Sequence, residues 1–114
     1  MRNLIDKRVL ITGAGSGLGR SLALLFAKNG WRVACTDRDA GTAATTLKEL
    51  QAAGGTGLAM ALDVTSDASF AVVVERLKKD WGGLDVLINN AGVATAGTVE
   101  DAPQSQWDWV MNIN

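Results

Sequence analysis

A run of glycines constrains the fold of this chain more than any other feature of the sequence. Residues 12–19 read TGAGSGLG; they follow the apolar residues 9–11 and precede a helical pattern of apolar residues. Gly13, Gly17 and Gly19 let the backbone turn sharply and come close to another group. Free amides at the start of the following helix, together with the helix dipole, favour an anion at the same place. We therefore predict that a pyrophosphate binds at this turn.

The spacing of these glycines differs from the two commonest phosphate-binding motifs. A G-x-G-x-x-G motif would need glycine at Leu18, and a P-loop would need glycine at Ala14 and lysine at Arg20. The run is instead G-x-x-x-G-x-G. A tight turn without a ligand is the alternative interpretation, but its place between the first strand and the first helix favours nucleotide binding. The expected cofactor contacts in this run are Gly13, Ser16, Gly17, Leu18 and Gly19.

The composition is that of a soluble globular domain. Of 114 residues, 47% are hydrophobic and 20% are charged, and the net charge is −1. We expect one dinucleotide-binding domain over residues 1–114, with no nucleic-acid partner, because the chain lacks a basic excess. We also expect no membrane association, because the apolar runs are too short to span a bilayer. The chain opens without a signal-peptide segment, and the lone Cys35 predicts a buried thiol in a cytoplasmic protein.

Short apolar strands alternate with helical patterns along the chain. The expected strands are 8–12, 32–36, 58–62 and 86–88. The expected buried faces are Leu18, Leu22, Leu25 and Phe26 in the first helix, Ala43, Leu47 and Leu50 in the second, and Phe70, Val73, Val74, Leu77 and Trp81 in the third. Ser66 is suited to cap the third helix, and Pro103 suits the first turn of a last one.

This alternation predicts an α/β fold, a Rossmann-like doubly wound parallel sheet. Helical crossovers join parallel strands with a right-handed sense. Strands without polar alternation are those covered on both faces. We expect the spatial order 3-2-1-4, which opens a ligand crevice between the first and fourth strands, where the winding reverses.

Asp37 and Arg38, at the end of the second strand, bear on the choice of cofactor. In a dinucleotide fold a carboxylate at this place accepts hydrogen bonds from the adenosine ribose and repels a 2′-phosphate. Arg38 argues the other way, since a guanidinium pairs with such a phosphate. The glycine run holds no basic residue, because position 16 is Ser. We predict NAD as the cofactor, with NADP less favoured; a solvated loop charge is the alternative for Asp37.

Polar residues at the ends of the third and fourth strands are further candidates. Asp63 lies where an adenine ring is expected, and its carboxylate can accept a hydrogen bond from the ring amine. An Asx turn or a helix cap ahead of Ser66 is the alternative. The amides in residues 89–92 can bridge adjacent strands beside a ligand, with plain turn chemistry as the alternative. The cofactor candidates of these two segments are Asp63, Val64, Asn90, Ala91 and Gly92.

Asn114 is the candidate catalytic residue of the chain. It shares helical spacing with Trp107, Val110 and Met111, which places it on an apolar, core-facing stripe. A buried amide needs hydrogen-bond partners, so such a residue is a functional candidate. A helix that has already ended and frays is the alternative.

Taken together, these residues resemble the short-chain dehydrogenase/reductase family. The resemblance rests on residues 12–19, Asp37, 63–64, 89–92 and 107–114, in the family's order and spacing over the whole chain. It implies an extended Rossmann sheet with a nicotinamide cofactor across the strand tips. It gives Asn114 the part of the family's catalytic Asn, whose main chain helps to hold a water in a proton relay. It gives residues 89–92 a part in stabilising the sheet and lining the cofactor pocket.

The sequence departs from the family at the general acid/base. In the family this is a Tyr in a Tyr-x-x-x-Lys motif preceded by a Ser, and all of these come later than Asn114; the chain has no Tyr and no His. Hydride transfer to or from a carbonyl needs a proton donor or acceptor. The resemblance thus implies the N-terminal portion of an NAD(P)-dependent oxidoreductase of alcohols or carbonyl compounds. We expect it to be homo-oligomeric at full length and inactive as this chain alone.

Two other functions fit part of the pattern. A non-catalytic dinucleotide-binding module would use the same glycine run to sense a cofactor or to pair with another chain. A methyltransferase-like nucleotide fold also uses an acidic residue after its second strand, but the glycine spacing and residues 89–92 argue against it. We expect no metal site in any of these cases.

Overall fold

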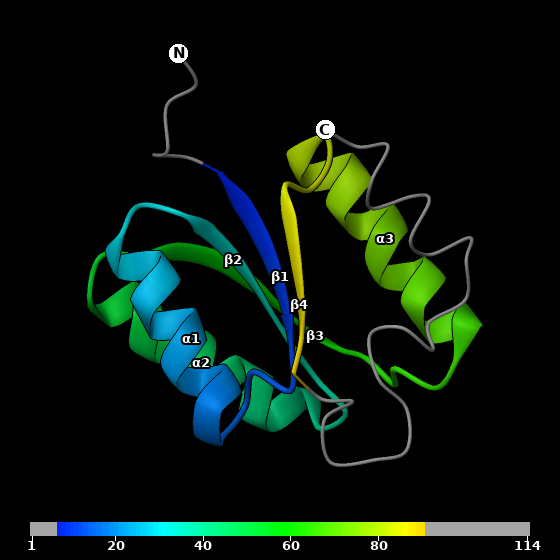
Figure 1. Ribbon diagram of the computed structural model, residues 1–114, viewed down its shortest axis with the longest axis horizontal. Coiled ribbons are helices and arrows are strands. Elements are labelled where there is room, and N and C mark those ends of the chain that lie inside the picture. Colours follow the sequence, from blue (N-terminus) through cyan, green and yellow to red (C-terminus); the bar gives the residue numbers. More distant parts are fainter. Residues whose placement is uncertain (1–6, 91–114) are drawn as a thin grey trace.

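Strands and helices alternate along residues 7–90, the part of the chain that the computed structural model describes. The elements are β1 (Arg8–Thr12), α1 (Gly17–Lys28), β2 (Arg32–Asp37), α2 (Ala40–Ala52), β3 (Thr56–Ala61), α3 (Asp67–Trp81) and β4 (Val86–Asn89). All the strand pairs are parallel, in the order β3-β2-β1-β4 (Figure 1). The predicted Rossmann-like sheet and its 3-2-1-4 order are confirmed. The expected last helix after Pro103 lies outside the described residues.

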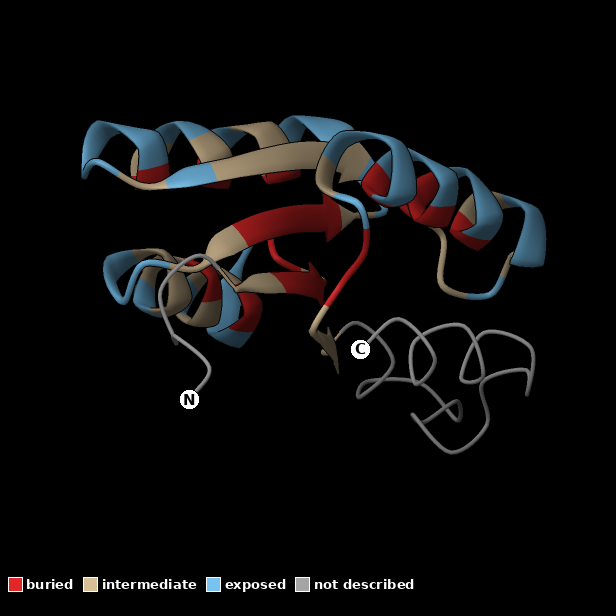
Figure 2. Cartoon of the chain, turned by 90° about the horizontal axis from the view of Figure 1, so that it is seen from above, coloured by how far each residue is buried: buried red, intermediate tan, exposed pale blue. Residues whose placement is uncertain are grey.

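Helices cover both faces of the sheet. α1 and α2 lie on one face and α3 on the other (Figure 1). Because side chains alternate along a strand, Val9 and Ile11 join the core beneath α1 and α2, while Leu10 joins the core beneath α3. Figure 2 shows the buried residues gathered on the central strands and on one side of each helix. Between residues 7 and 90, no helix has the length and apolar character needed to cross a bilayer.

The strand boundaries follow pairing more closely than hydrophobicity. β3 covers Thr56–Ala61 rather than the expected 58–62, since it pairs with β2 residue for residue from Arg32 to Asp37. β2 and β4 each extend one residue beyond the prediction, to Asp37 and Asn89. Leu62 is buried although it lies past the end of its strand. Backbone hydrogen bonds to the neighbouring strand therefore fix these ends.

The predicted buried face of α1 is wrong in part. Leu18 and Leu25 are 65% and 54% exposed, and the fully buried positions are Gly19 and Ala23. Small residues at these two positions let the helix approach the sheet closely, which turns the larger leucines outward. Leu22 and Phe26 still pack against the core from the edge of this face.

The other two helices follow their predictions except at Leu47 and Trp81, which are only partly buried against the core, and the single thiol is buried as expected. The predicted α3 residues Phe70, Val73, Val74 and Leu77 are buried. Ser66 caps α3 by accepting a hydrogen bond from the Ser69 amide at 3.1 Å, and Gly82 ends it in the left-handed region at φ 74°. In α2, Ala43 and Leu50 are buried as expected, and so is Thr46. Cys35 is buried within β2, where desolvation raises the pKa of its thiol to about 12.

An ion pair ties the starts of β1 and β4 together. The Arg8 side chain donates from Nε to Asp85 Oδ2 at 3.0 Å, and the Arg8 amide donates to the same oxygen at 2.8 Å. Arg8 Nη1 also donates to the Trp81 carbonyl oxygen at 3.1 Å, which adds the end of α3. Hydrogen bonds from Arg8 hold the pKa of Asp85 below its usual value. The side chains are only 21% and 11% exposed, so solvent screens the pair weakly.

We expect Asp85→Asn to lower the free energy of unfolding by about 1–2 kcal/mol at neutral pH, because the charge on the Arg8 acceptor is lost. The folded-state pKa of Asp85 is depressed, so its contribution is complete above the unfolded pKa and is lost as the pH falls through the folded value. Urea denaturation from neutral pH to about pH 3 should show the gap between wild type and variant closing below about pH 4.

The matched control is Asp80→Asn, because Asp80 pairs with Arg76 on the exposed face of α3. Exposed pairs contribute little, so this variant should differ from the wild type by less than about 0.5 kcal/mol at every pH. A gap for Asp85→Asn that stayed constant with pH would contradict the assignment.

Candidate cofactor-binding site

The turn between β1 and α1 needs glycine at two positions. Gly13 has φ 65° and Gly17 has φ 55°, both in the left-handed region that a side chain disfavours. Gly13 directly follows the last residue of β1, and Gly17 is the first residue of α1. The sharp turn predicted at the glycine run is therefore made by Gly13 and Gly17, while Gly19 has no positive φ.

Gly19 lets the helix pack directly on this turn. A Cβ atom at position 19 would lie 2.0 Å from the Gly13 carbonyl oxygen and 2.8 Å from Asn90 Nδ2. At Gly17, in contrast, an added Cβ would have no neighbour within 4 Å among residues 7–90. The described residues thus fill the space beside Gly19 and leave the space beside Gly17 open to solvent.

The middle of the turn is tied to β2 and α2. The Ala14 amide donates to the Thr36 carbonyl oxygen at 2.9 Å, and the Ala14 carbonyl oxygen accepts from Thr46 Oγ1 at 2.9 Å. All three residues are buried. The sequence analysis missed Thr46, although a hydroxyl on the apolar side of a helix, one residue before Leu47, is a signal that could have found it.

Asp37 holds the glycine turn from the tip of β2. Its Oδ2 accepts from the Gly15 amide at 3.0 Å, and its Oδ1 accepts from the Asp39 amide at 3.1 Å. The sequence predicted a carboxylate near the cofactor ribose; the structure places that carboxylate beside the turn itself. Each oxygen retains acceptor capacity after these bonds.

The start of α1 presents its backbone to solvent. Ser16, Gly17 and Leu18 are all exposed. Ser16 makes no side-chain cap, and the first turn of α1 holds no acidic residue, whereas Asp39 caps α2 and Ser66 caps α3. The amides at the positive end of α1 are therefore available to an anion.

Asp63 and Arg38 lie together beyond the tips of β3 and β2. Asp63 Oδ1 accepts from the Thr65 amide at 3.0 Å and from Thr65 Oγ1 at 2.6 Å, which is the Asx turn given above as the alternative. These bonds lower the pKa of Asp63. Asp63 Oδ2 lies 3.7 Å from Arg38 Nη2 in an exposed ion pair. Val64 packs against the core beneath α3. Contact of Asp63 and Val64 with an adenine ring stays a prediction.

The two asparagines at the end of β4 join it to β1. Asn89 Oδ1 accepts from Thr12 Oγ1 at 2.8 Å, and Asn90 Nδ2 donates to the Gly13 carbonyl oxygen at 3.3 Å. The sequence predicted that these amides bridge backbone groups of adjacent strands: Asn90 does so, whereas Asn89 bonds to the Thr12 hydroxyl. The candidates Ala91, Gly92 and Asn114 lie outside the described residues.

Parallel pairing gathers these groups at one edge of the sheet. Thr12 pairs with Asn89, and Asp37 pairs with Ala61 just before Asp63, so the carboxyl ends of all the described strands meet there. Oriented amides, a carboxylate and side-chain amides thus surround the turn. Such an edge can hold a phosphorylated, polyhydroxylated ligand.

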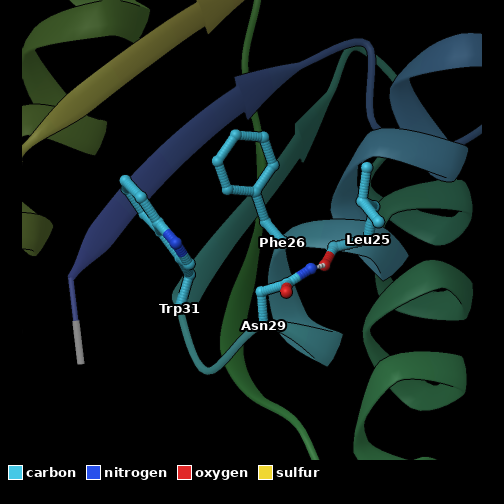
Figure 3. Close-up of a pocket in the computed structure, with 4 residues that line it drawn as sticks. All are labelled: Leu25, Phe26, Asn29 and Trp31. Carbon is cyan, nitrogen blue, oxygen red and sulfur yellow. Dashed lines mark hydrogen bonds between the residues drawn. The ribbon is translucent and has the colours of Figure 1, made fainter. Parts of the chain in front are cut away.

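A hollow at the far end of α1 is separate from this edge. Leu25, Phe26, Asn29 and Trp31 line about 320 Å³ there (Figure 3). The rings of Phe26 and Trp31 meet edge to face at 4.9 Å, and Asn29 Nδ2 donates to the Leu25 carbonyl oxygen at 2.8 Å. None of the predicted site residues lines it.

Comparison with known proteins identifies the family. A family model described as "short chain dehydrogenase" matches residues 7–114. The chain belongs to the short-chain dehydrogenase family. The resemblance drawn from the glycine run, Asp37 and residues 89–92 is thereby confirmed. A nicotinamide cofactor and a small-molecule substrate are general features of this family.

Several oxidoreductases of the short-chain dehydrogenase family are similar to this chain. "Probable oxidoreductase EphD" of Mycobacterium tuberculosis is 38% identical and matches 96% of this chain and 18% of its own length. "CLA biosynthesis dehydrogenase/reductase" of Lactiplantibacillus plantarum is 35% identical over 100% of this chain and 40% of its own. The crystal structure of a hydroxysteroid dehydrogenase from Escherichia coli is 28% identical with a TM-score of 0.79, covering 97% of this chain and 52% of that one. The chain therefore spans about half or less of these relatives.

We expect Gly19→Ala to lower the free energy of unfolding by about 2–3 kcal/mol, because the added carbon would meet the Gly13 backbone, which cannot move without breaking the turn. Gly41→Ala is the matched control: its added carbon would lie 3.1 Å from Asp39 Oδ1, a side-chain atom that can yield by a small shift, rather than from backbone. Alanine is also favoured in a helix, so the control should change stability by less than about 1 kcal/mol in either direction. Equal urea midpoints for the two variants would refute the close packing of α1 on the turn.

Proposed function

We propose that this chain is the cofactor-binding portion of an NAD(P)-dependent oxidoreductase that moves hydride between a nicotinamide and an alcohol or carbonyl compound. The observation that carries the proposal is the turn before α1. Its backbone is fixed through Ala14 and Gly15, while the space beside Gly17 is open and α1 has no side-chain cap. Such a turn offers amide donors to phosphate oxygens without rearrangement.

Different residues at this edge of the sheet would contact different parts of the cofactor. The Gly13–Gly19 segment, with Ser16, Gly17 and Leu18 at its exposed crest, would hold the pyrophosphate. Asp37 would accept hydrogen bonds from the adenosine ribose through its remaining lone pairs. Asp63 and Val64 would flank the adenine, and Asn90, Ala91 and Gly92 would line the way to the nicotinamide. When bound, the nicotinamide supplies the hydride chemistry; the chain supplies position and charge.

NAD is the cofactor that the charges favour. The Asp37 carboxylate is held beside the turn by two backbone amides, where a 2′-phosphate would meet a like charge. The neighbouring cation, Arg38, pairs with Asp63 at 3.7 Å. This exposed pair is weak, so Arg38 stays available to a 2′-phosphate; the proposed preference for NAD rests on Asp37, which two backbone amides hold in place. NADP is therefore the less favoured cofactor.

The proton step needs groups from elsewhere in the complete enzyme. The chain contains no Tyr and no His, and it spans about half or less of the relatives described above. We assign the general acid/base to a Tyr-x-x-x-Lys segment in that enzyme and a supporting part in the proton relay to Asn114. The relatives bear names with different substrates, so the proposal extends only to the alcohol and carbonyl class.

The proposal also covers the cellular location and the oligomeric state of the complete enzyme. A buried Cys35 with its thiol pKa raised is inert, as suits a protein of the reducing cytoplasm. We further propose that the complete enzyme is a homo-oligomer.

Titration calorimetry tests cofactor binding directly. The wild-type chain should bind NAD with a dissociation constant in the micromolar range, about −8 kcal/mol in free energy. Gly17→Val should weaken binding at least about tenfold, because the side chain fills the open space and strains a left-handed residue. Gly54→Val is the matched control: Gly54 also has positive φ and no neighbour within 4 Å of an added Cβ, but it follows α2, away from the turn. Weakening by both variants alike would argue against binding at the turn.

We expect the 114-residue chain to show no turnover with NAD and a panel of secondary alcohols, because it lacks a Tyr or His to exchange the proton. Formation of NADH, followed by its absorbance, should not exceed that of Gly17→Val. NAD-dependent oxidation well above this variant would overturn the assignment of the proton step to another segment.

A further inference from the structure

Gly15 is enclosed by Thr42 of α2 and by Asp37, the residue proposed above to contact the adenosine ribose. A Cβ atom at this position would lie 2.2 Å from Thr42 Oγ1, 2.6 Å from Thr42 Cβ and 2.9 Å from Asp37 Oδ2. Gly15 carries no positive φ that would by itself require glycine. Space, rather than backbone conformation, is what excludes a side chain here.

The Asp37 carboxylate depends on this space. Its Oδ2 lies 3.0 Å from the Gly15 amide nitrogen and its Oδ1 lies 3.1 Å from the Asp39 amide nitrogen. One backbone donor to each carboxylate oxygen thus fixes its orientation. Hydrogen bonds to a charged group are among the stronger ones in proteins, and the oxygen that accepts from the Gly15 amide is the one that a side chain at position 15 would crowd.

Thr42, the other neighbour of Gly15, cannot easily move away. Thr42 lies in the first turn of α2, where its hydroxyl donates to the Asp39 carbonyl oxygen at 3.0 Å and its amide faces the Asp39 carboxylate. One turn later, the buried Thr46 hydroxyl fastens α2 to the Ala14 carbonyl oxygen. A side chain at position 15 would therefore displace the Asp37 carboxylate, because this side-chain end can move more easily than Thr42.

We propose that Gly15 is a specificity-determining residue for the cofactor: its missing side chain lets the turn hold the Asp37 carboxylate where a 2′-phosphate would have to lie. This inference rests on the proposed function. Neither nearby charged group replaces Asp37: Asp39 caps α2, and Arg38, exposed and weakly paired, would attract a 2′-phosphate rather than exclude it. Gly15 acts through Asp37, so it is a positioning residue for the discrimination and touches no reacting atom.

The test compares dissociation constants for NAD and NADP by calorimetry in the wild-type chain, Gly15→Ala, Asp37→Ala and the double variant. Gly15→Ala should reduce the preference for NAD over NADP about tenfold, the effect of one displaced charged hydrogen bond. Asp37→Ala should reduce it at least as much. The double variant should match Asp37→Ala, because residues that act through one group are not additive. Gly41→Ala is the control. Gly41 precedes Thr42, but the nearest neighbour of its added Cβ is Asp39 Oδ1, so this variant should keep the wild-type preference for NAD over NADP.

An unchanged preference in Gly15→Ala, or additive effects in the double variant, would overturn the inference. If Gly15→Ala does not fold, Thr42→Gly removes its two nearest neighbours, and the comparison becomes Gly15→Ala/Thr42→Gly against Thr42→Gly alone. The remaining 2.9 Å contact still moves the carboxylate, so the preference should again fall; an equal preference in this pair would also reject the idea.

Amide hydrogen exchange in the cofactor-free chain separates this inference from the proposed function. The Gly15 amide should be protected in the wild type and exposed in Asp37→Ala. Protection without binding of either dinucleotide would reject the proposed function, and this inference with it. NAD binding without Gly15 protection would leave the function standing and reject the role of Gly15.

Discussion

The peptide groups on either side of Ala14 hold the turn, β2 and α2 in one arrangement. Its amide donates to the end of β2 and its carbonyl oxygen accepts from Thr46 of α2, and every partner is buried. A buried polar group left unpaired costs about 1–3 kcal/mol, so the turn cannot leave this position cheaply. The rigidity of the turn comes from these neighbours, while Ser16, Gly17 and Leu18, which follow it, stay exposed to solvent.

Packing and binding make opposite demands on the same short segment. At Gly19 the helix is pressed onto the Gly13 carbonyl oxygen, and at Gly17 the space is open. Close packing through Gly19 and Ala23 explains why Leu18 lies exposed at the crest of the turn. The small residues Gly19 and Ala23 thus bring α1 close to the sheet, and the amino end of the helix faces solvent.

The sequence predicted the architecture well because strong periodicity and turn residues agree. α3 carries a full apolar stripe, a serine cap and a glycine stop, so its bounds and buried face could be read directly. α1 could not, because the pattern of leucines does not reveal that two small residues approach the sheet. Thr46 and the bond from Gly15 to Asp37 join residues distant in sequence. Such contacts follow from tertiary packing, which apolar spacing does not encode. For Asp63, residue type alone could not decide between an adenine contact and an Asx turn; the structure shows the hydrogen bond of the Asx turn.

The two helix layers share the strands between them. Val9 and Val33 belong to the core under α1 and α2, while their immediate neighbours Leu10 and Ala34 belong to the core under α3. Loss of packing in either helix layer therefore disturbs the strands against which the other layer packs. The domain should melt as one cooperative unit, and stabilisation gained at the strand tips would be shared by both halves.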